Sequence, residues 1–411
     1  MNRLAKLPLY LMMGFAGIFS FSACSDDDNK VSSTDGLISD NELQTIVQQY
    51  VDATVNPTYK LLAAETESLA NSLADLRDKV KNGTVTDAEI KNVCDIFLHA
   101  RSYYETSEAF LFGAASDYGI DPHIDSWPLD VDELKTQLSN TLLFAKMEAD
   151  ETGMYANSLA TTLLGFHGIE YVLFRDGEPR TAEALKGNDP DLNNLSGYNE
   201  IVYATSVARD LRNSCFHMEC AWNAQAPQSH IDIVENVCEW SASVVDQDYT
   251  YTDKMLNVNK PGYGFASWKE AISEILVAGC INISDEVGNT KLGKPVSGDD
   301  VNYIESPYSH KSLDDFTDNI VSIENSYMGG REELRDESKS LHALMQKYNP
   351  TLDTRMLNAI QNAKAKIQAI PHPFVSYIQE QTDRTAGQAA IEACNELSNV
   401  TQDINNYILA N

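Results

Sequence analysis

The amino-acid sequence predicts an all-α protein built from two helical bundles. Apolar residues recur at helical spacing along most of the chain. Capping residues, glycines and prolines separate these periodic segments, and segments with the alternation of a β-strand are scarce. We expect the first bundle to span residues 37–190 and the second to span residues 191–411, with the connection in the polar segment 175–196.

Residues 1–23 have the features of a signal peptide. Basic residues precede an apolar run at 7–21, which is too short for a stable span of a bilayer. Ala23 before Cys24 is typical of a lipobox, so we expect Cys24 to become the lipid-modified first residue of the mature protein. The alternative is an ordinary signal peptide with a structural cysteine beside it.

An acidic run at 25–28 follows Cys24 directly. It resembles the tag that sends lipoproteins of some Gram-negative bacteria through the outer membrane, and we expect residues 24–36 to form a tether. These features predict a lipoprotein that is anchored in the outer membrane and exposed on the cell surface. The alternative is that the acidic run only keeps the tether solvated.

Charge and cysteine content limit the classes of partner. The formal net charge of -31 argues against nucleic acid, because binding to phosphates needs a basic surface. Six cysteines follow Cys24, and an even number in an exported protein permits disulfide bonds, although the spacing does not select a pairing. The spacing does not resemble a zinc knuckle either, and buried free thiols are favoured for several of the six.

Capping signals define the helices of the first bundle. Ser39 or Asp40 is the expected cap of the first helix, Asn82 and Gly83 end its continuation, and the TDAE sequence at 86–89 begins the next helix as a capping box. The expected elements are helices at 39–81 with a break at Pro57, at 86–113, from about 130, and at 153–174, with a loop at 117–132.

The second bundle repeats this pattern with a longer series of helices. The expected helices lie at 198–222, 229–245, 265–288, 313–329, 332–347, and from 351 to the C-terminus with a break at Pro371 and Pro373.

The stretch 153–174 is the most distinctive part of the chain, because its residues are apolar, small or hydroxylic apart from His167 and Glu170. A helix that is apolar nearly all round is buried, and two residues three positions apart lie on one face of it. Burying ionisable groups is costly unless they are paired or bind a ligand. The two side chains are therefore either a structural pair that satisfies itself or the centre of a binding site.

The hexapeptide GFHGIE at 165–170 matches GxHxxE, the signature of the imelysin-like proteins, which are also classed as a metallopeptidase family. Residues 100–113 resemble an aromatic and glutamate-rich segment of that family, and residues 121–128 resemble the loop that follows it. Residues 306–330 resemble a serine-rich turn that leads into a helix ending in Tyr-x-Gly. The resemblance spans most of the mature chain, and it implies an association with iron-regulated uptake.

The resemblance implies a metal site near the interface of the bundles. His167 and Glu170 supply at most two ligands from one helix, so further ligands are expected from Glu105, Glu108 or His123. Carboxylates and imidazoles from different helices hold the metals of di-iron bundle proteins, although the motif there is Glu-x-x-His. Such ligands suit iron, zinc or copper, and the family association favours iron.

A metallopeptidase that uses the HxxE motif is the alternative function. A peptidase needs a metal with an open coordination position and a base or polarised water. The sequence lacks HExxH and its inverted form, and it offers no evident complete catalytic set.

Four further residues are candidates for lining the cleft between the bundles, namely His123, Trp127, Ser309 and Asp315. Asp315 also lies in the first turn of an expected helix, where the helix dipole favours an acidic residue for structural reasons alone. Arg101 and Glu105 are spaced as a salt bridge on a helix face. A free metal, haem, a siderophore or a peptide could be the ligand, and outer-membrane transport proteins are candidate partners.

Overall fold

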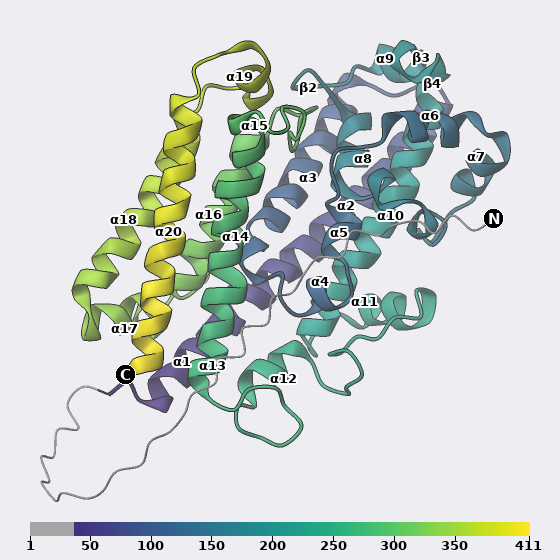
Figure 1. The fold of residues 1–411 in the computed structure, drawn as a ribbon. Helices are drawn as coiled ribbons and strands as arrows, with labels where there is room; N and C mark the ends of the chain where they lie inside the picture. Colours follow the sequence, from purple (N-terminus) through teal and green to yellow (C-terminus); the bar gives the residue numbers. More distant parts are fainter. Residues whose placement is uncertain (1–36) are drawn as a thin grey trace, which may run out of the picture. The chain divides into compact units, whose positions relative to one another are not determined.

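The computed structural model describes residues 37–411, and helices dominate this part of the chain (Figure 1). The expected signal peptide, Cys24 and the acidic tether lie outside the described residues. The predicted all-α fold class is confirmed, because the only strands among residues 37–411 are four segments of two residues each. No helix in this range is both long and apolar enough to cross a bilayer.

The first ten helices and all four strands precede residue 223. Strands β1 and β2 pair antiparallel, as do β3 and β4. The elements are α1 (Asp40–Tyr50), α2 (Asn56–Lys81), α3 (Asp87–Glu105), α4 (Ala114–Asp117), α5 (Asp121–Ile124), α6 (Val131–Ser139), α7 (Thr141–Glu148), α8 (Gly165–Leu173), β1 (Phe174–Arg175), β2 (Glu178–Pro179), α9 (Ala182–Lys186), β3 (Asn188–Asp189), β4 (Leu195–Ser196) and α10 (Gly197–Trp222).

The remaining helices vary from single turns to the long C-terminal helix. They are α11 (Gln228–Asp232), α12 (Tyr251–Leu256), α13 (Trp268–Ser273), α14 (Asn282–Glu286), α15 (Gly293–Ser297), α16 (Ser312–Met328), α17 (Leu341–Tyr348), α18 (Pro350–Gln368), α19 (Phe374–Glu380) and α20 (Thr385–Ala410).

The predicted capping residues begin and end the first helices. Ser39 caps α1 through a capping box with Glu42, and Thr86 caps α3 through a capping box with Glu89. Asn82 is the C-cap of α2, and Gly83 follows it with a φ of 67°, a left-handed conformation that favours glycine.

Residues 37–411 contain four π-helical segments, one of which, Ile233–Val237, follows the short helix α11, and the other three lie within longer helical stretches. The first, Val51–Val55, joins α1 to α2 just before the proline that was expected to break the helix. The other two, Glu274–Ile281 and Val287–Lys291, flank α14, so that residues 268–297 follow one nearly continuous helical path. Turns of this kind are frequent at functional sites, because the extra residue re-aims the side chains that follow it.

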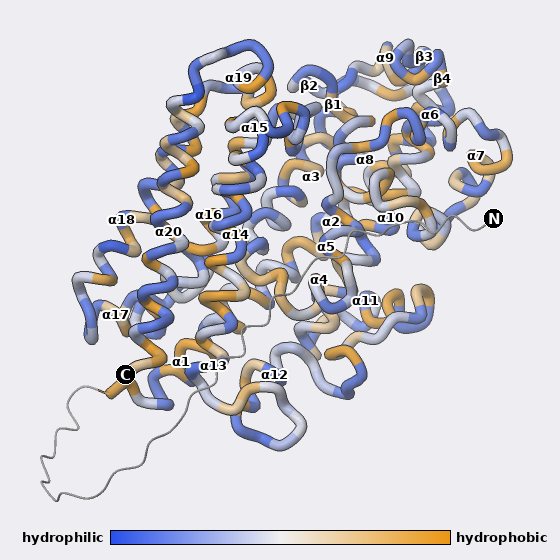
Figure 2. The backbone as a smooth tube through the Cα atoms, viewed as in Figure 1, coloured by the Kyte–Doolittle hydropathy of each residue, from blue (hydrophilic) through white to orange (hydrophobic). Residues whose placement is uncertain are grey.

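The long helices pack side by side across the expected boundary at residue 190. α10 lies along α2, α2 along α3, α16 contacts both α3 and α18, and α18 pairs with α20. Apolar positions recur along each of these helices (Figure 2), and one continuous core cluster includes residues from Ile38 to Ile408. Residues 38–411 form one compact unit, and the division into two bundles at residue 190 stays a prediction.

Several helices are shorter than predicted. The helix expected at 153–174 begins only at Gly165, because Leu164 is extended and Gly165 has a φ of 67°. Residues 150–156 instead form turns around Asp150, whose carboxylate accepts hydrogen bonds from the backbone N–H groups of Gly153 and Ala156. The helix expected at 86–113 ends at Glu105, and the one expected at 332–347 begins only with α17.

The six cysteines that follow Cys24 are all buried free thiols in the structure. They are Cys94, Cys215, Cys220, Cys238, Cys280 and Cys394.

Candidate functional site

The two glycines of the GxHxxE segment let α8 pack unusually closely against its neighbours. A Cβ atom on Gly165 would lie 1.8 Å from the carbonyl oxygen of Ile124, and one on Gly168 would lie 2.3 Å from the hydroxyl of Tyr203. Glycine is therefore required at position 165, where the neighbour is backbone, and at position 168 a larger residue would have to displace the Tyr203 side chain. The contact at Gly165 holds the segment after α5 against the start of α8 and so places Asp125 beside His167.

His167 and Glu170 lie on one face of α8 and contact each other, as their spacing predicts. Nδ1 of His167 is 3.1 Å from Oε2 of Glu170, and both side chains are almost completely buried. The other oxygen of Glu170 accepts hydrogen bonds from the backbone N–H groups of Tyr308 and Ser309 and from the Ser309 hydroxyl. Glu170 is thereby fixed as an acceptor that orients the imidazole ring.

Nε2 of His167 points toward a buried cluster of charged side chains. It lies 3.2 Å from Oδ1 of Asp125, which also accepts a hydrogen bond from Arg101. The guanidinium of Arg101 additionally contacts Glu105 and Glu305, each at 2.5 Å, and its Nε is 3.6 Å from Asp315. Arg101 therefore joins carboxylates from four separate segments of the chain.

Lys291 brings a second buried cation into the same cluster from the end of a π-helical turn. Its Nζ is 3.2 Å from Glu305, 3.6 Å from Glu108 and 3.8 Å from Glu105. Side chains from α16 complete the polar surroundings, with Asn319 donating to Glu105 at 2.5 Å and Ser306 donating to Asp315 at 2.5 Å from the loop before α16.

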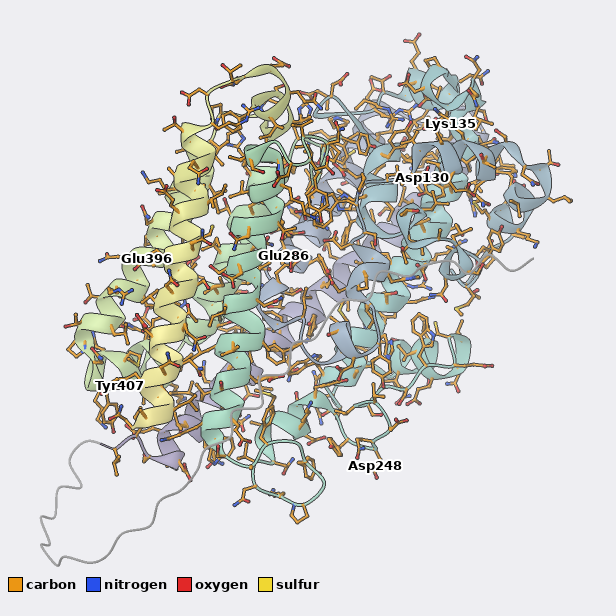
Figure 3. The ribbon with its side chains drawn as sticks, viewed as in Figure 1. Asp130, Lys135, Asp248, Glu286, Glu396 and Tyr407 are labelled. Carbon is orange, nitrogen blue, oxygen red and sulfur yellow. The ribbon has the colours of Figure 1, made fainter. Side chains whose placement is uncertain are left out.

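Burial and mutual repulsion shift the pKa values of the acidic groups upward. Burial raises the pKa values of Glu105 and Glu108 well above their usual range, and it raises the pKa of Asp315 to about 7. Glu286, which is labelled in Figure 3 at the end of α14, also has a pKa raised by burial. In the absence of another cation, these carboxyl groups tend to hold protons.

Asp125 and His167 shift in the directions expected of an ion pair. Burial alone would raise the pKa of Asp125, but Arg101 and His167 outweigh it and hold that pKa well below its usual range. Burial would lower the pKa of His167, but the carboxylates of Asp125 and Glu170 outweigh it and raise the pKa to about 9. His167 is therefore protonated at neutral pH in this arrangement.

Five polar atoms of the cluster have incomplete hydrogen bonding among residues 37–411. Oε2 of Glu305, Oδ1 of Asn319 and Oε1 of Glu105 are buried and accept no hydrogen bond, and Nε2 of His167 and Nε of Arg101 are not aligned as hydrogen bonds on any acceptor. Buried polar atoms without a hydrogen bond cost free energy.

Three sets of potential ligand atoms lie within 4.8 Å of one another in this cluster. One set contains a histidine nitrogen, and the other two contain carboxylates only. The sets are Asp125, His167 and Glu305; Glu105, Glu305 and Asp315; and Glu105, Glu108 and Asp125.

Most of the residues selected from the sequence meet in this cluster. Trp127 lies at its edge, with its ring 6.1 Å from that of His167 and 5.5 Å from Nζ of Lys291. His123 does not join it, because Nε2 of His123 pairs with Asp210 at 2.8 Å. The remaining selected residues in the cluster or in contact with it are His167, Glu170, Glu105, Glu108, Ser309 and Asp315.

Sequence analysis missed four members of the cluster, which are Asp125, Lys291, Glu305 and Asn319. Asp125 lies in the 121–128 segment that carries part of the family resemblance, and Glu305 directly precedes the 306–330 segment. The resemblance could therefore have identified both residues. Lys291 and Asn319 carry no such signal. Arg101 and Glu105 do form the expected ion pair, but in the interior and not on a solvated helix face.

Comparison with known proteins identifies the family of this chain. The chain matches the imelysin family (peptidase family M75) over residues 55–401. It is 24% identical over 388 residues to iron-regulated protein A of Synechococcus elongatus, covering 93% of this chain and 90% of that protein.

Two solved structures share the fold. An iron-regulated protein A precursor from Parabacteroides distasonis superposes with a TM-score of 0.73 at 28% identity, covering 91% of this chain and 97% of that one. An imelysin-like protein from Psychrobacter arcticum superposes with a TM-score of 0.59 at 13% identity over the same shares of the two chains. From the family match across most of its length, this chain belongs to the imelysin family.

Proposed function

We propose that this protein binds a metal ion, with iron favoured over zinc, in the buried cluster around His167. The observation that carries the proposal is the imbalance of charge in the interior. Six carboxyl groups are opposed by only three cationic side chains, namely Glu105, Glu108, Asp125, Glu170, Glu305 and Asp315 against Arg101, His167 and Lys291. A buried excess of carboxylates is stable only if protons or a bound cation neutralise it.

The ligands that fit best are Asp125, His167 and Glu305. Their donor atoms lie within 4.8 Å of one another, and Nε2 of His167 and Oε2 of Glu305 are the atoms with incomplete hydrogen bonding. Glu170 holds the other ring nitrogen of His167, as carboxylates commonly do for metal-binding histidines. Glu170 is thus assigned to orienting the ring, while Glu105, Glu108 and Asp315 balance charge around the ion.

Burial favours a bare ion over a bulky ligand. His167, Asp125 and Glu305 are exposed by 2%, 6% and 1%, so haem or a siderophore could reach them only if the surrounding helices separated. An imidazole with carboxylates suits iron and zinc alike. The similarity to proteins described as iron-regulated favours iron.

A role in metal acquisition at the cell surface follows if the N-terminal features act as proposed. Cys24 would carry the lipid anchor in the outer membrane, and the acidic run at 25–28 would direct the protein to the outer face, where outer-membrane transport proteins are the fitting partners. Replacing Cys24 with serine should release the protein from the outer-membrane fraction. Full retention of the Cys24→Ser protein in that fraction would contradict the anchor.

Metallopeptidase activity is the second candidate, since the family is named as a peptidase family. A peptide bond would have to reach a metal beside His167, which is 2% exposed. Chelator-sensitive cleavage of a peptide by the purified protein would favour this candidate over storage or transfer of the ion.

The metal site can be tested by thermal unfolding and elemental analysis of the chelator-treated protein, with and without added Fe²⁺ or Zn²⁺. A ligand that binds only the folded state stabilises it by about 2.7 kcal/mol at a hundredfold excess over its Kd. We expect added metal to raise the unfolding temperature of the natural protein. This rise should be lost in His167→Ala and in Glu305→Gln.

The matched control for these variants is His230→Ala. His230 is also buried and pairs with a buried glutamate, at 2.6 Å from Glu219, but it lies outside the cluster. Its variant should keep the metal-induced shift. Equal shifts in the His167 and His230 variants, or no shift in the natural protein, would refute the site.

A further inference from the structure

A second site of a different kind lies beside α10. It is a pocket of about 250 Å³ between the α4–α5 segment, α10 and the chain near residue 240. Its walls include the aromatic side chains of Tyr118, His217 and Trp240 and the polar side chains of His123, Asn157 and Ser214. None of these residues belongs to the cluster around His167.

His123 presents a hydrogen-bond acceptor to this pocket. Its Nε2 is 2.8 Å from Oδ2 of Asp210, and Oδ1 of Asp210 accepts a hydrogen bond from Asn157. Because a carboxylate only accepts hydrogen bonds, Nε2 carries a proton, and in the neutral ring Nδ1 has the lone pair. No hydrogen bond within residues 37–411 engages that Nδ1.

His217 presents a second acceptor in the same way. Its Nε2 donates to the backbone carbonyl of Ser241 at 2.9 Å, which leaves Nδ1 unprotonated and without a hydrogen bond in the described part of the chain. Burial lowers the pKa of His217 to about 4, so the ring is neutral at physiological pH. The side chain is only 4% exposed, and the residue lines the pocket.

The aromatic rings of the pocket pack against one another, with Tyr118 tilted by 47° against His217. The ring of His217 lies 4.3 Å from that of Tyr118 and 5.2 Å from that of Trp240, at an interplanar angle of 26° to the latter. Rings in this arrangement offer a surface for a further flat group and for a cation beside it.

The charged residues around the pocket favour one sign of charge on the ligand. The residues that line the pocket include no lysine or arginine, and Asp210 lies directly behind His123. Burial raises the pKa of Tyr118, a hydrogen bond with Ser241 opposes that rise, and the carboxylates of Asp117 and Asp246 add to it. The surroundings therefore favour a cation over an anion.

We propose that this pocket binds a small aromatic amine, with its ring against the aromatic walls and its ammonium group donating to His123 and His217. The hydroxyl of Ser214 is available for a polar substituent on the ring. This proposal does not rest on the metal site, because the two sites share no residue.

The proposal can be tested with tyramine and 4-hydroxyphenylacetate, which share a phenol ring and carry opposite charges. Isothermal titration calorimetry should detect tyramine binding and at least about tenfold weaker binding of the acid. Quenching of tryptophan fluorescence on tyramine addition should disappear in Trp240→Phe. Equal affinities for the two compounds, or no binding of tyramine at millimolar concentration, would overturn the proposal.

Two variants locate the binding within the pocket. His217→Phe keeps an aromatic ring at this position but removes the acceptor, and it should weaken tyramine binding at least about tenfold, as expected when a charged donor loses one acceptor. Ser214→Leu should block the cavity sterically. His230→Phe, which changes a buried histidine elsewhere, should bind tyramine normally. Unchanged affinity in His217→Phe and Ser214→Leu, or binding of Zn²⁺ in place of tyramine, would refute the amine site.

Discussion

His167 is the residue on which the interior charges of this protein converge, because a carboxylate faces each of its ring nitrogens. Glu170 contacts Nδ1 and Asp125 lies beside Nε2. The same residue spacing would suit a self-satisfied structural pair. In the structure, Glu170 accepts hydrogen bonds from residues 308–309, whereas Nε2 of His167 faces a cluster with incomplete hydrogen bonding.

The stability of the metal-free protein should fall as the pH rises past neutrality. The folded pKa of His167, about 9, is above its ordinary value of 6.5, so folding binds its proton more tightly. The resulting stabilisation is complete below about pH 6.5 and is lost as the pH rises through about 9, amounting to at most about 3 kcal/mol. Urea unfolding in the presence of a chelator, at intervals from pH 6 to pH 9.5, measures it.

His167→Gln is the matched variant for this pH dependence. Asp315 also has a folded pKa above its ordinary value of 3.8. Its contribution to stability is therefore lost at lower pH than that of His167, as the pH rises from about 3.8 to about 7. Because the variant retains Asp315, the difference between the two proteins isolates His167. If the free energy of unfolding fell equally with pH above 7 in the two proteins, His167 would not be held as a cation.

At the scale of single elements, the close contact between α8 and the segment after α5 is the feature that brings Asp125 and His167 together. Asp125 follows Ile124, whose carbonyl touches Gly165 at the start of α8, and His167 is one half-turn further along. A change at Gly165 therefore alters both the stability of α8 and the distance between Asp125 and His167.

Gly165→Ala should destabilise the protein more than Gly83→Ala. Both glycines have a φ of 67°, so alanine is strained at each by about 1–2 kcal/mol. A Cβ at Gly83 meets nothing within 4 Å, whereas one at Gly165 meets the Ile124 backbone at 1.8 Å. We expect the excess loss at Gly165 to be about 2 kcal/mol or more, measured as a difference in urea midpoints.

The Gly165 variant should also lose metal-induced stabilisation, while the Gly83 variant keeps it. If both glycine variants lost the same stability and bound metal equally, the close contact would not be what positions the ligands.

At the scale of the whole molecule, the excess of acidic residues opposes folding. The formal net charge of -31 means that the average interaction between surface charges is repulsive, and repulsion is greatest in the compact state. Exposed ion pairs such as that of Lys91 with Asp95 add little stability and do not offset this repulsion.

Moderate salt should therefore stabilise the protein. Raising the NaCl concentration from about 10 mM to about 150 mM shortens the screening length from about 30 Å to about 8 Å. We expect the unfolding temperature to rise over this range, whereas sucrose at the same osmolarity should raise it much less. A lower unfolding temperature in NaCl would show that attractive ion pairs outweigh the net repulsion.

Local sequence signals account for the helical class, the caps and the pair on α8. The capping boxes at Ser39 and Thr86 and the helix end at Asn82 and Gly83 depend on residues within one helical turn, and each is confirmed. The contact between His167 and Glu170 is of the same kind, because it follows from a spacing of three residues within a helix.

The composition of the charged cluster depends on the packing of the whole chain. Arg101 and Glu305 are 204 positions apart, and they meet only because α3 and α16 pack against each other. Lys291 reaches the same point from a π-helical turn, an irregularity that apolar periodicity does not predict. Helical periodicity depends on residues that are near in the sequence, so the sequence alone predicts it. The contacts of a buried side chain depend on which helices pack together at its position, and only the tertiary structure determines that.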